Sequence, residues 1–293
     1  MKIKSKDWYS QGNTIEIDDL NVFYKRSGMG STLLCIHGFP TSSWDFAEIW
    51  PELTSHFDAI TSDLIGLGRS AKPRQSITVA YQADIIEKLL LALDIKEAHI
   101  LAHDLGDTVA QELLARQSEN KSPVKWLSCI MMNGGIFHET HRPRLIQRLL
   151  LSPIGPWIAK STTEATYHRN MKNIFSKQHP PAEEFLTDSW MLITENDGIS
   201  MIPRVIQYMK ERVTYRERWI SPLVYPTVPI RLINGALDPI SGQHMADRFD
   251  ELVPNADIVS ILDAGHYPHL ESPEQVLEAI LKFHNKIYQT KME

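Results

Sequence analysis

The stretch from Ala98 to Arg116 constrains the fold most strongly. Residues 98–101 are an apolar run typical of a buried strand, and apolar side chains recur at helical spacing from residue 107 to 116. A strand, a tight turn and a helix therefore meet at Asp104. Small residues lie two positions before it, Ala102, and two after it, Gly106. A sharp strand-to-helix turn requires small residues there, because larger side chains would collide with the neighbouring backbone.

The layout is that of a nucleophile elbow, G-x-S-x-G, with Ala102 in place of the first glycine and Asp104 in place of the serine. A carboxylate attacks acyl carbons poorly, because its product would be an anhydride. It can instead displace an epoxide oxygen or a halide from a saturated carbon and form an alkyl ester that water then hydrolyses. The alternative is a structural role, since an aspartate before a helix is commonly an N-cap.

Composition limits the class of protein. The 293 residues suffice for one large domain with an insertion, and 43% apolar and 23% charged residues are typical of a globular protein. The net charge of −6 predicts neither a nucleic-acid nor a membrane partner. Cys35 and Cys129 lie in apolar runs, which indicates buried thiols in a reducing compartment. With no signal-like or membrane-spanning segment, we expect a cytoplasmic protein.

Strand-like and helical patterns alternate along most of the chain, which predicts a mostly parallel, doubly wound α/β sheet. The exception is residues 137–220, which have little strand character and are rich in Trp, Tyr, Arg, Met and Pro. We expect an α-helical cap there, inserted between core segments 1–136 and 221–293. The expected strands are 33–36, 59–61, 98–101, 126–132, 230–233 and 258–262, the main helices are 79–93, 107–116, 243–252 and 276–288, and residues 14–25 are expected to form a hairpin.

Three candidate catalytic residues follow predicted strands. Asp104, Asp238 and His266 come in the order nucleophile, acid and base, and the carboxyl ends of strands are where reactive groups gather in such sheets. His266 would activate water and Asp238 would orient the imidazole. A second turn that could hold the acidic residue follows the predicted strand 126–132, but it contains Asn133, whose side chain has no charge.

The loop His37-Gly38-Phe39-Pro40 is predicted to supply half of an oxyanion hole. The backbone N–H groups of Phe39 and Leu105 would stabilise the tetrahedral intermediate, and Pro40 is a candidate cis-proline. No local His or acid spacing predicts a metal site, and no cofactor is expected. The glycines of residues 63–70 do not have the spacing of a dinucleotide-binding loop.

Taken together, these residues resemble the α/β-hydrolase superfamily, and within it the epoxide hydrolase and haloalkane dehalogenase branch, which uses an aspartate nucleophile. The likeness is greatest to mesoderm-specific transcript proteins, through residues 103–114 and through Asn133-Gly134-Gly135-Ile136-Phe137 with residues 139–143. Those proteins carry membrane-associated apolar segments, and this chain shows none, which agrees with the expectation of no membrane partner.

The resemblance also implies roles for cap residues. Epoxide hydrolases use cap tyrosines to protonate the opening oxygen, a role that falls to Tyr208, with Tyr167 as a candidate for the second donor. His103 and Trp190 are further candidates for substrate binding. Haloalkane dehalogenases bind halide through paired side-chain N–H donors, but Leu105 and Phe39 occupy the corresponding positions.

The predicted function is therefore hydrolysis of a small apolar epoxide to a diol through an ester on Asp104. A dehalogenase with an unusual halide site, in which Trp157, Trp190 or Trp219 supplies a donor, is the alternative enzyme. A non-catalytic ligand-binding protein on the same fold is the alternative outside enzymes. A serine esterase is disfavoured because the chain contains no G-x-S-x-G. The sequence leaves open whether the chain is a monomer or a homodimer.

Overall fold

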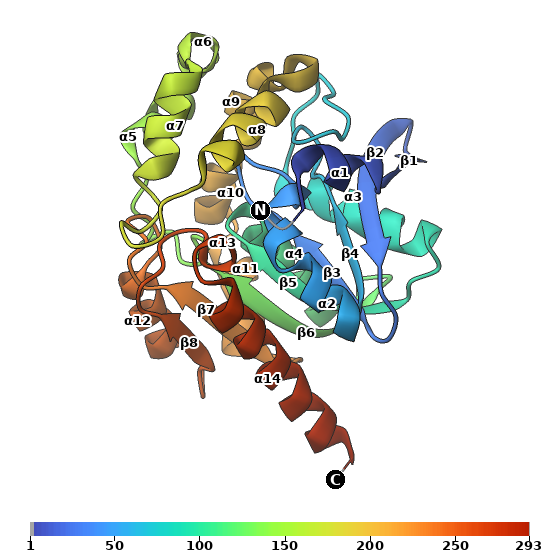
Figure 1. The fold of residues 1–293 in the computed structure, drawn as a ribbon. Helices are drawn as coiled ribbons and strands as arrows, with labels where there is room; N and C mark the ends of the chain where they lie inside the picture. Colours follow the sequence, from blue (N-terminus) through green and yellow to red (C-terminus); the bar gives the residue numbers. More distant parts are fainter. Residues whose placement is uncertain (1–2, 293) are drawn as a thin grey trace.

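The structure is a computed structural model that describes residues 3–292. Its centre is an eight-stranded sheet with the order β1-β2-β4-β3-β5-β6-β7-β8 (Figure 1). The first two strands form the predicted antiparallel hairpin, β2 also pairs with β4 antiparallel, and all further pairings, from β4 through β3 and β5 to β8, are parallel. The strands are β1 Asn13–Ile17, β2 Leu20–Ser27, β3 Thr32–Ile36, β4 Asp58–Ser62, β5 Glu97–His103, β6 Lys125–Met132, β7 Ile230–Gly235 and β8 Ile258–Ile261.

The order of the strands explains why helices cover both faces of the sheet. The chain steps from β3 to β4 in one direction and returns past β3 to β5. Because β-α-β crossovers are right-handed, the two connections place α2 (Trp50–His56) and α3 (Val79–Ala92) on opposite faces. Strands β3, β5 and β6 are thereby covered on both sides and are almost entirely buried, as their continuous apolar runs predict.

The remaining core helices surround this sheet. A short helix, α1, and a 3-10 helix, η1, precede α2. The predicted doubly wound α/β class is confirmed. The remaining core helices are α1 Ser5–Ser10, η1 Ser43–Glu48, α4 Leu105–Ser118, α11 Arg216–Val224, α12 Gln243–Leu252, α13 Pro268–Glu271 and α14 Pro273–Met292.

The segment between β6 and α11 is helical and lies over the carboxyl ends of the strands (Figure 1). It contains most of the segment 137–220 that was predicted as a cap. Helix α11 extends past residue 220 and packs against α4 of the core, where Trp219 Nε1 donates to Glu112 Oε2 at 2.8 Å. The cap helices are α5 Leu145–Leu150, α6 Gly155–Ser161, α7 Glu164–Lys172, α8 Glu183–Thr194, η2 Glu195–Ser200, α9 Ile202–Val205 and α10 Tyr208–Thr214.

Among residues 3–292, no helix has the length and apolar character needed to cross a bilayer.

The turn between β5 and α4 is as tight as the small residues predict. A Cβ atom on Gly106 would lie 2.2 Å from the carbonyl oxygen of Ile36, on the neighbouring strand β3. The first turn of α4 therefore reaches the sheet backbone only because residue 106 has no side chain, and this approach fixes the position of Asp104.

We predict that Gly106→Ala lowers the free energy of unfolding by about 1–3 kcal/mol, because the added methyl group must push α4 away from β3. Urea denaturation of the variant and the parent measures this difference. Ser118→Ala, at the far end of the same helix, is the control and should change the free energy by less than about 0.5 kcal/mol. Equal stability of Gly106→Ala and the parent would contradict the tight packing of α4 on β3.

Candidate active site

Asp104 lies at the turn between β5 and α4 with φ 52° and ψ −105°. Its side chain makes no capping hydrogen bond to the helix, so the N-cap interpretation does not describe it. Instead, its Oδ1 accepts a hydrogen bond from the backbone N–H of Phe39 at 2.9 Å. A strained left-handed conformation that aims a carboxylate away from its own helix is typical of a functional turn.

The structure brings the three predicted catalytic residues together. His266 Nδ1 lies 2.8 Å from Asp238 Oδ2, and His266 Nε2 lies 3.6 Å from Asp104 Oδ2. All three residues are at most 3% exposed. The imidazole therefore bridges two buried carboxylates, hydrogen-bonded to Asp238 and facing Asp104.

Asp238 is held by groups that the sequence analysis did not assign. Asn133 Nδ2 donates to Asp238 Oδ2 at 3.0 Å, Ser241 Oγ donates to the same oxygen at 2.9 Å, and the Ile240 N–H donates to Oδ1 at 2.7 Å. The sequence analysis noted Asn133 only because its turn could have held the acid. In the structure, the Asn133 amide orients the Asp238 carboxylate, and a neutral donor does this better than a second anion would.

Electrostatics favour the ion-paired state of the site. Burial alone raises the pKa of Asp104, but the contact with His266 and the charge of Arg212 outweigh burial and hold that pKa below its usual range. Burial lowers the pKa of His266, but Asp238 and Asp104 together raise it. These shifts favour an ionised Asp104 paired with a protonated His266.

We predict that Asp104→Asn lowers the pKa of His266 by about 1–3 pH units, because the amide removes one of the two facing anions. An NMR titration of the imidazole C–H signals measures it. Asp263→Asn is a matched control, since Asp263 lies near His266 in the sequence but contacts His179. An unchanged His266 pKa in Asp104→Asn would contradict the pairing.

Arg212 was not predicted and reaches the site from the cap helix α10. Its Nη2 donates to the backbone oxygen of Asp104 at 3.1 Å, and its Nε donates to Thr108 Oγ1 at 2.7 Å. The side chain is 3% exposed. It ties the cap to the nucleophile turn and places a positive charge behind the carboxylate. Nothing in the local pattern of an arginine on a cap helix reveals this contact.

A cavity of about 120 Å³ opens onto the reactive atoms. Asp104 and His266 line its floor, together with Phe39 and Pro40, whose peptide bond is cis as predicted. Most of its wall is apolar, which suits an apolar ligand. The wall residues from the cap and the strand ends are Arg144, Ile146, Gln147, Leu150, Ala159, Thr162, Tyr167, Asn170, Met171, Ile174, Trp190, Ile193, Ile199, Ile202 and Ile240.

The four predicted substrate-binding residues separate into two pairs. Tyr167 and Trp190 line the cavity, with their ring centroids 5.6 Å apart. Tyr208 is not among the lining residues: its ring is buried between Phe39, 6.1 Å away, and the Arg212 guanidinium, 4.6 Å away, and its role in substrate binding stays a prediction. The contact with Arg212 determines how α10 faces the core.

His103 does not line the cavity either, which corrects the prediction that it binds substrate. Its ring lies behind the site, where Nε2 is 2.8 Å from the backbone oxygen of His266. The residue positions the loop that carries the imidazole. Of the other tryptophans considered as halide donors, Trp157 is 77% exposed and Trp219 bonds Glu112, so Trp190 alone faces the cavity.

Of the two backbone donors predicted for an oxyanion hole, one contacts the Asp104 carboxylate. The Phe39 N–H already contacts Oδ1 of Asp104, as described above. Within the part of the chain that the structure describes, the Leu105 N–H makes no hydrogen bond to that side chain. The second predicted donor thus lies beside the carboxylate at the start of α4 without contacting it.

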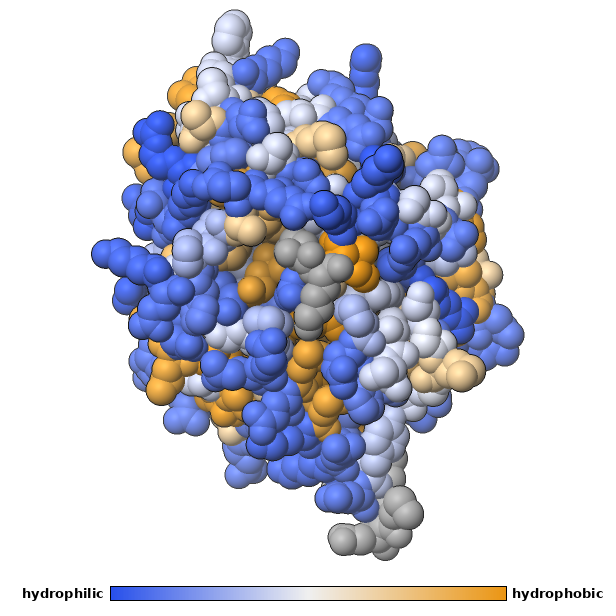
Figure 2. Space-filling view, viewed as in Figure 1, coloured by the Kyte–Doolittle hydropathy of each residue, from blue (hydrophilic) through white to orange (hydrophobic). Residues whose placement is uncertain are grey.

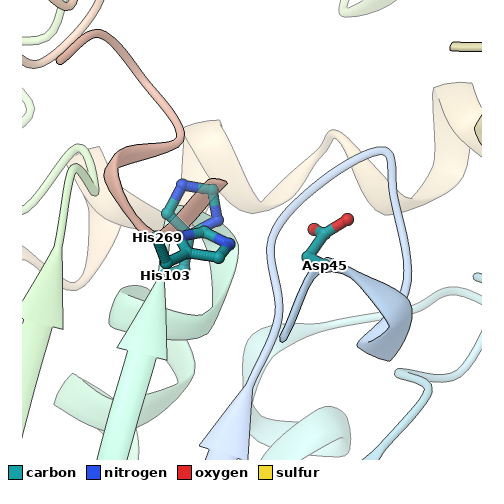
Figure 3. A group of neighbouring side chains, drawn as sticks. All are labelled: Asp45, His103 and His269. Carbon is teal, nitrogen blue, oxygen red and sulfur yellow. The ribbon is translucent and has the colours of Figure 1, made fainter. Parts of the chain in front are cut away.

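One group of side chains has the residue types of a metal site. Asp45, His103 and His269 are buried, and one donor atom of each lies within 4.8 Å of the other two (Figure 3). The Thr41 hydroxyl also bonds Asp45. No fourth His, Cys, Asp or Glu joins them among residues 3–292. The group has one ligand fewer than a structural zinc site, and since all three residues are buried and none lines the cavity, it lacks the accessible fourth position of a catalytic one.

Comparison with known proteins agrees with this architecture. Residues 31–273 match the family described as the alpha/beta hydrolase fold. The chain belongs to the α/β-hydrolase fold family. It is 38% identical to the mesoderm-specific transcript protein of Mus musculus over 95% of this chain and 87% of that protein. It is also 32% identical to LipZ of Mycobacterium tuberculosis, which is named as a hydrolase, over 94% of this chain and 96% of that one.

Solved structures share the fold at low sequence identity. A haloalkane dehalogenase variant, DbeA-M1 from Bradyrhizobium elkanii, superposes with a TM-score of 0.81 at 19% identity, over 96% of this chain and 98% of the other. The family predicted from the sequence is thereby confirmed, and so is its likeness to mesoderm-specific transcript proteins.

Proposed function

We propose that this α/β-hydrolase opens a small apolar epoxide through an alkyl ester on Asp104 and releases a diol. The observation that carries the proposal is the position of the Asp104 carboxylate. One oxygen is held by the Phe39 N–H, and the other lies 3.6 Å from His266 Nε2 on the floor of an apolar cavity. The two oxygens of one carboxylate thus have different partners and can play different parts.

In the first step, Oδ2 of Asp104 attacks an epoxide carbon, and the carbon–oxygen bond of the ring breaks. The departing oxygen needs a proton donor on the cavity wall. Tyr167 offers a buried hydroxyl there, and its proton moves to the alkoxide. The product is an ester between Asp104 and a hydroxyalkyl group.

In the second step, ester formation has removed the negative charge of Asp104, so the pKa of His266 falls. The imidazolium gives its proton, through water, to the Tyr167 phenolate left by the first step, and the neutral imidazole is then a base. It takes a proton from water, and the hydroxide attacks Cγ of the ester. The Phe39 N–H stabilises the negative charge that develops on Oδ1. The ester bond then breaks, the diol oxygen takes the proton from His266, and the Asp104 carboxylic acid so formed passes its proton to the imidazole, which restores the carboxylate and the imidazolium.

We predict that His266→Gln accumulates the ester, because alkylation needs Asp104 and hydrolysis needs the imidazole. Intact-protein mass spectrometry after incubation with a panel of small epoxides should show a gain equal to one whole epoxide. Asp104→Ala is the control and should show none. If neither variant gains mass from epoxides or bromoalkanes, the fold serves ligand binding and the proposal fails.

A dehalogenase is the second candidate, because Trp190 offers one N–H donor to the cavity. The same experiment separates the two reactions. A gain equal to an alkyl group without bromine, obtained with bromoalkanes and not with epoxides, would assign dehalogenation.

We predict that Tyr167→Phe reduces kcat/KM for epoxides by about 10²–10⁴-fold, the range for loss of a general acid. Tyr208→Phe is the matched control: it removes a buried hydroxyl that does not line the cavity and should reduce kcat/KM by less than about tenfold. If Tyr208→Phe reduced kcat/KM more than Tyr167→Phe, Tyr208 would be the general acid instead. Steady-state kinetics on both variants measure the difference.

A further inference from the structure

The outer edge of the cap combines exposed apolar side chains with unpaired cations. Three large apolar side chains are exposed there: Leu145 of α5 is 72% exposed, Ile154 in the turn before α6 is 52% exposed, and Trp157 of α6 is 77% exposed. Large apolar side chains at such exposures within one short segment are uncommon on a monomeric protein surface. Figure 2 shows apolar side chains reaching the surface among polar ones where α5–α7 lie, at the upper left.

The charge of this segment is opposite to that of the whole chain. Residues 140–163 contain no Asp or Glu but hold Arg142, Arg144, Arg148 and Lys160, whereas the chain as a whole carries −6. All four side chains are exposed, and within the described residues none pairs with an acid. The acids that flank the segment are engaged elsewhere, Glu139 with Arg216 and Glu164 with His168.

A groove beside the segment adds to the positive charge. It runs between α5–α6 and α9–α10 and is lined by three basic residues, Lys160, Arg204 and Lys210, and by no acidic residue. The acidic side chains of the neighbouring helix η2 are Glu195, which pairs with Arg69, and Asp197. The edge thus presents positive charges around an exposed apolar patch of Leu145, Ile154 and Trp157.

We propose that this edge, residues 142–160 with the adjoining groove, docks on the surface of a lipid bilayer that contains anionic headgroups. Trp157, Leu145 and Ile154 would enter the interface between headgroups and acyl chains, and the cations would contact the phosphates. A second copy of this chain is a poorer occupant, because a two-fold contact would place the unpaired cations opposite one another.

Docking in this orientation brings the candidate active site to the lipid surface. Arg144, Ile146 and Gln147 of the same segment line the cavity, and Arg144 is exposed. This step rests on the proposed function: the docked orientation places the cavity where an apolar substrate dissolved in the bilayer could enter it. The proposal departs from the expectation drawn from whole-chain charge, which averages over faces of opposite sign.

Vesicle co-sedimentation of the full chain tests the docking surface without any turnover, so its outcome is separate from that of the proposed function. We expect binding to phosphatidylcholine vesicles that contain phosphatidylglycerol, weakened by salt, and little binding to phosphatidylcholine alone. Replacing Arg142, Arg148 and Lys160 with Gln should weaken binding by about fivefold per cation. The matched control replaces Lys96, Lys121 and Lys125, exposed at the opposite end of the sheet, and should retain binding.

The apolar part has its own variant. Leu145→Ser with Trp157→Ser should weaken binding to the anionic vesicles at least about tenfold. Met29→Ser with Leu262→Ser, two residues that are 86% and 73% exposed elsewhere, should not. Thermal melting checks that each variant is folded. Binding that is equal on both vesicle types, or equal in cap and control variants, would overturn the proposal. Self-association in vesicle-free solution that the cap variants abolish would instead assign the edge to a second copy.

Discussion

The contact on which the site depends is the bridge that His266 makes between two buried carboxylates. Isolated buried charges are costly, and the two carboxylates are stabilised because one imidazole lies between them and because the backbone N–H groups of Phe39 and Ile240 satisfy their outer oxygens. This charge balance depends on the negative charge of Asp104. In the proposed reaction, conversion of Asp104 to a neutral ester would remove one anion and lower the pKa of His266, so that the imidazole could give up its proton and act as a base. The interaction that stabilises the resting site would then also control the start of the proposed second step.

The sequence predicted the parts of this arrangement that local constraints determine. The strand–turn–helix at Asp104 is visible because a buried apolar run, two small residues and a helical period lie within nineteen residues. Asp238 and His266 each follow a short apolar strand, and parallel strands place their carboxyl ends along one edge. These elements need no knowledge of distant contacts. The chemistry of an aspartate at the turn also follows from residue type alone.

Side chains of the cap could not be assigned in this way. Tyr208 and Tyr167 are both buried tyrosines on short helices, and only the rotation of each helix decides which one faces the cavity. Contacts such as Arg212 with the Asp104 carbonyl fix that rotation, and they join residues more than a hundred positions apart. His103 was misplaced for a similar reason. It adjoins the nucleophile in sequence, but successive side chains of a strand point to opposite faces, so its ring lies behind the site.

The cap is attached to the core unevenly. On one side, Arg212 reaches under the nucleophile turn, and the Glu271 carboxylate accepts backbone N–H groups from both Ser176 of the cap and Gly265 of the His266 loop. The α5–α6 segment instead presents unpaired cations and exposed apolar side chains to the outside. Movement of the anchored side would disturb Asp104 and His266, whereas movement of α5 changes mainly the cavity wall. Opening of the cavity on the α5 side would therefore leave the geometry of Asp104 and His266 intact, as a buried, charge-balanced site needs.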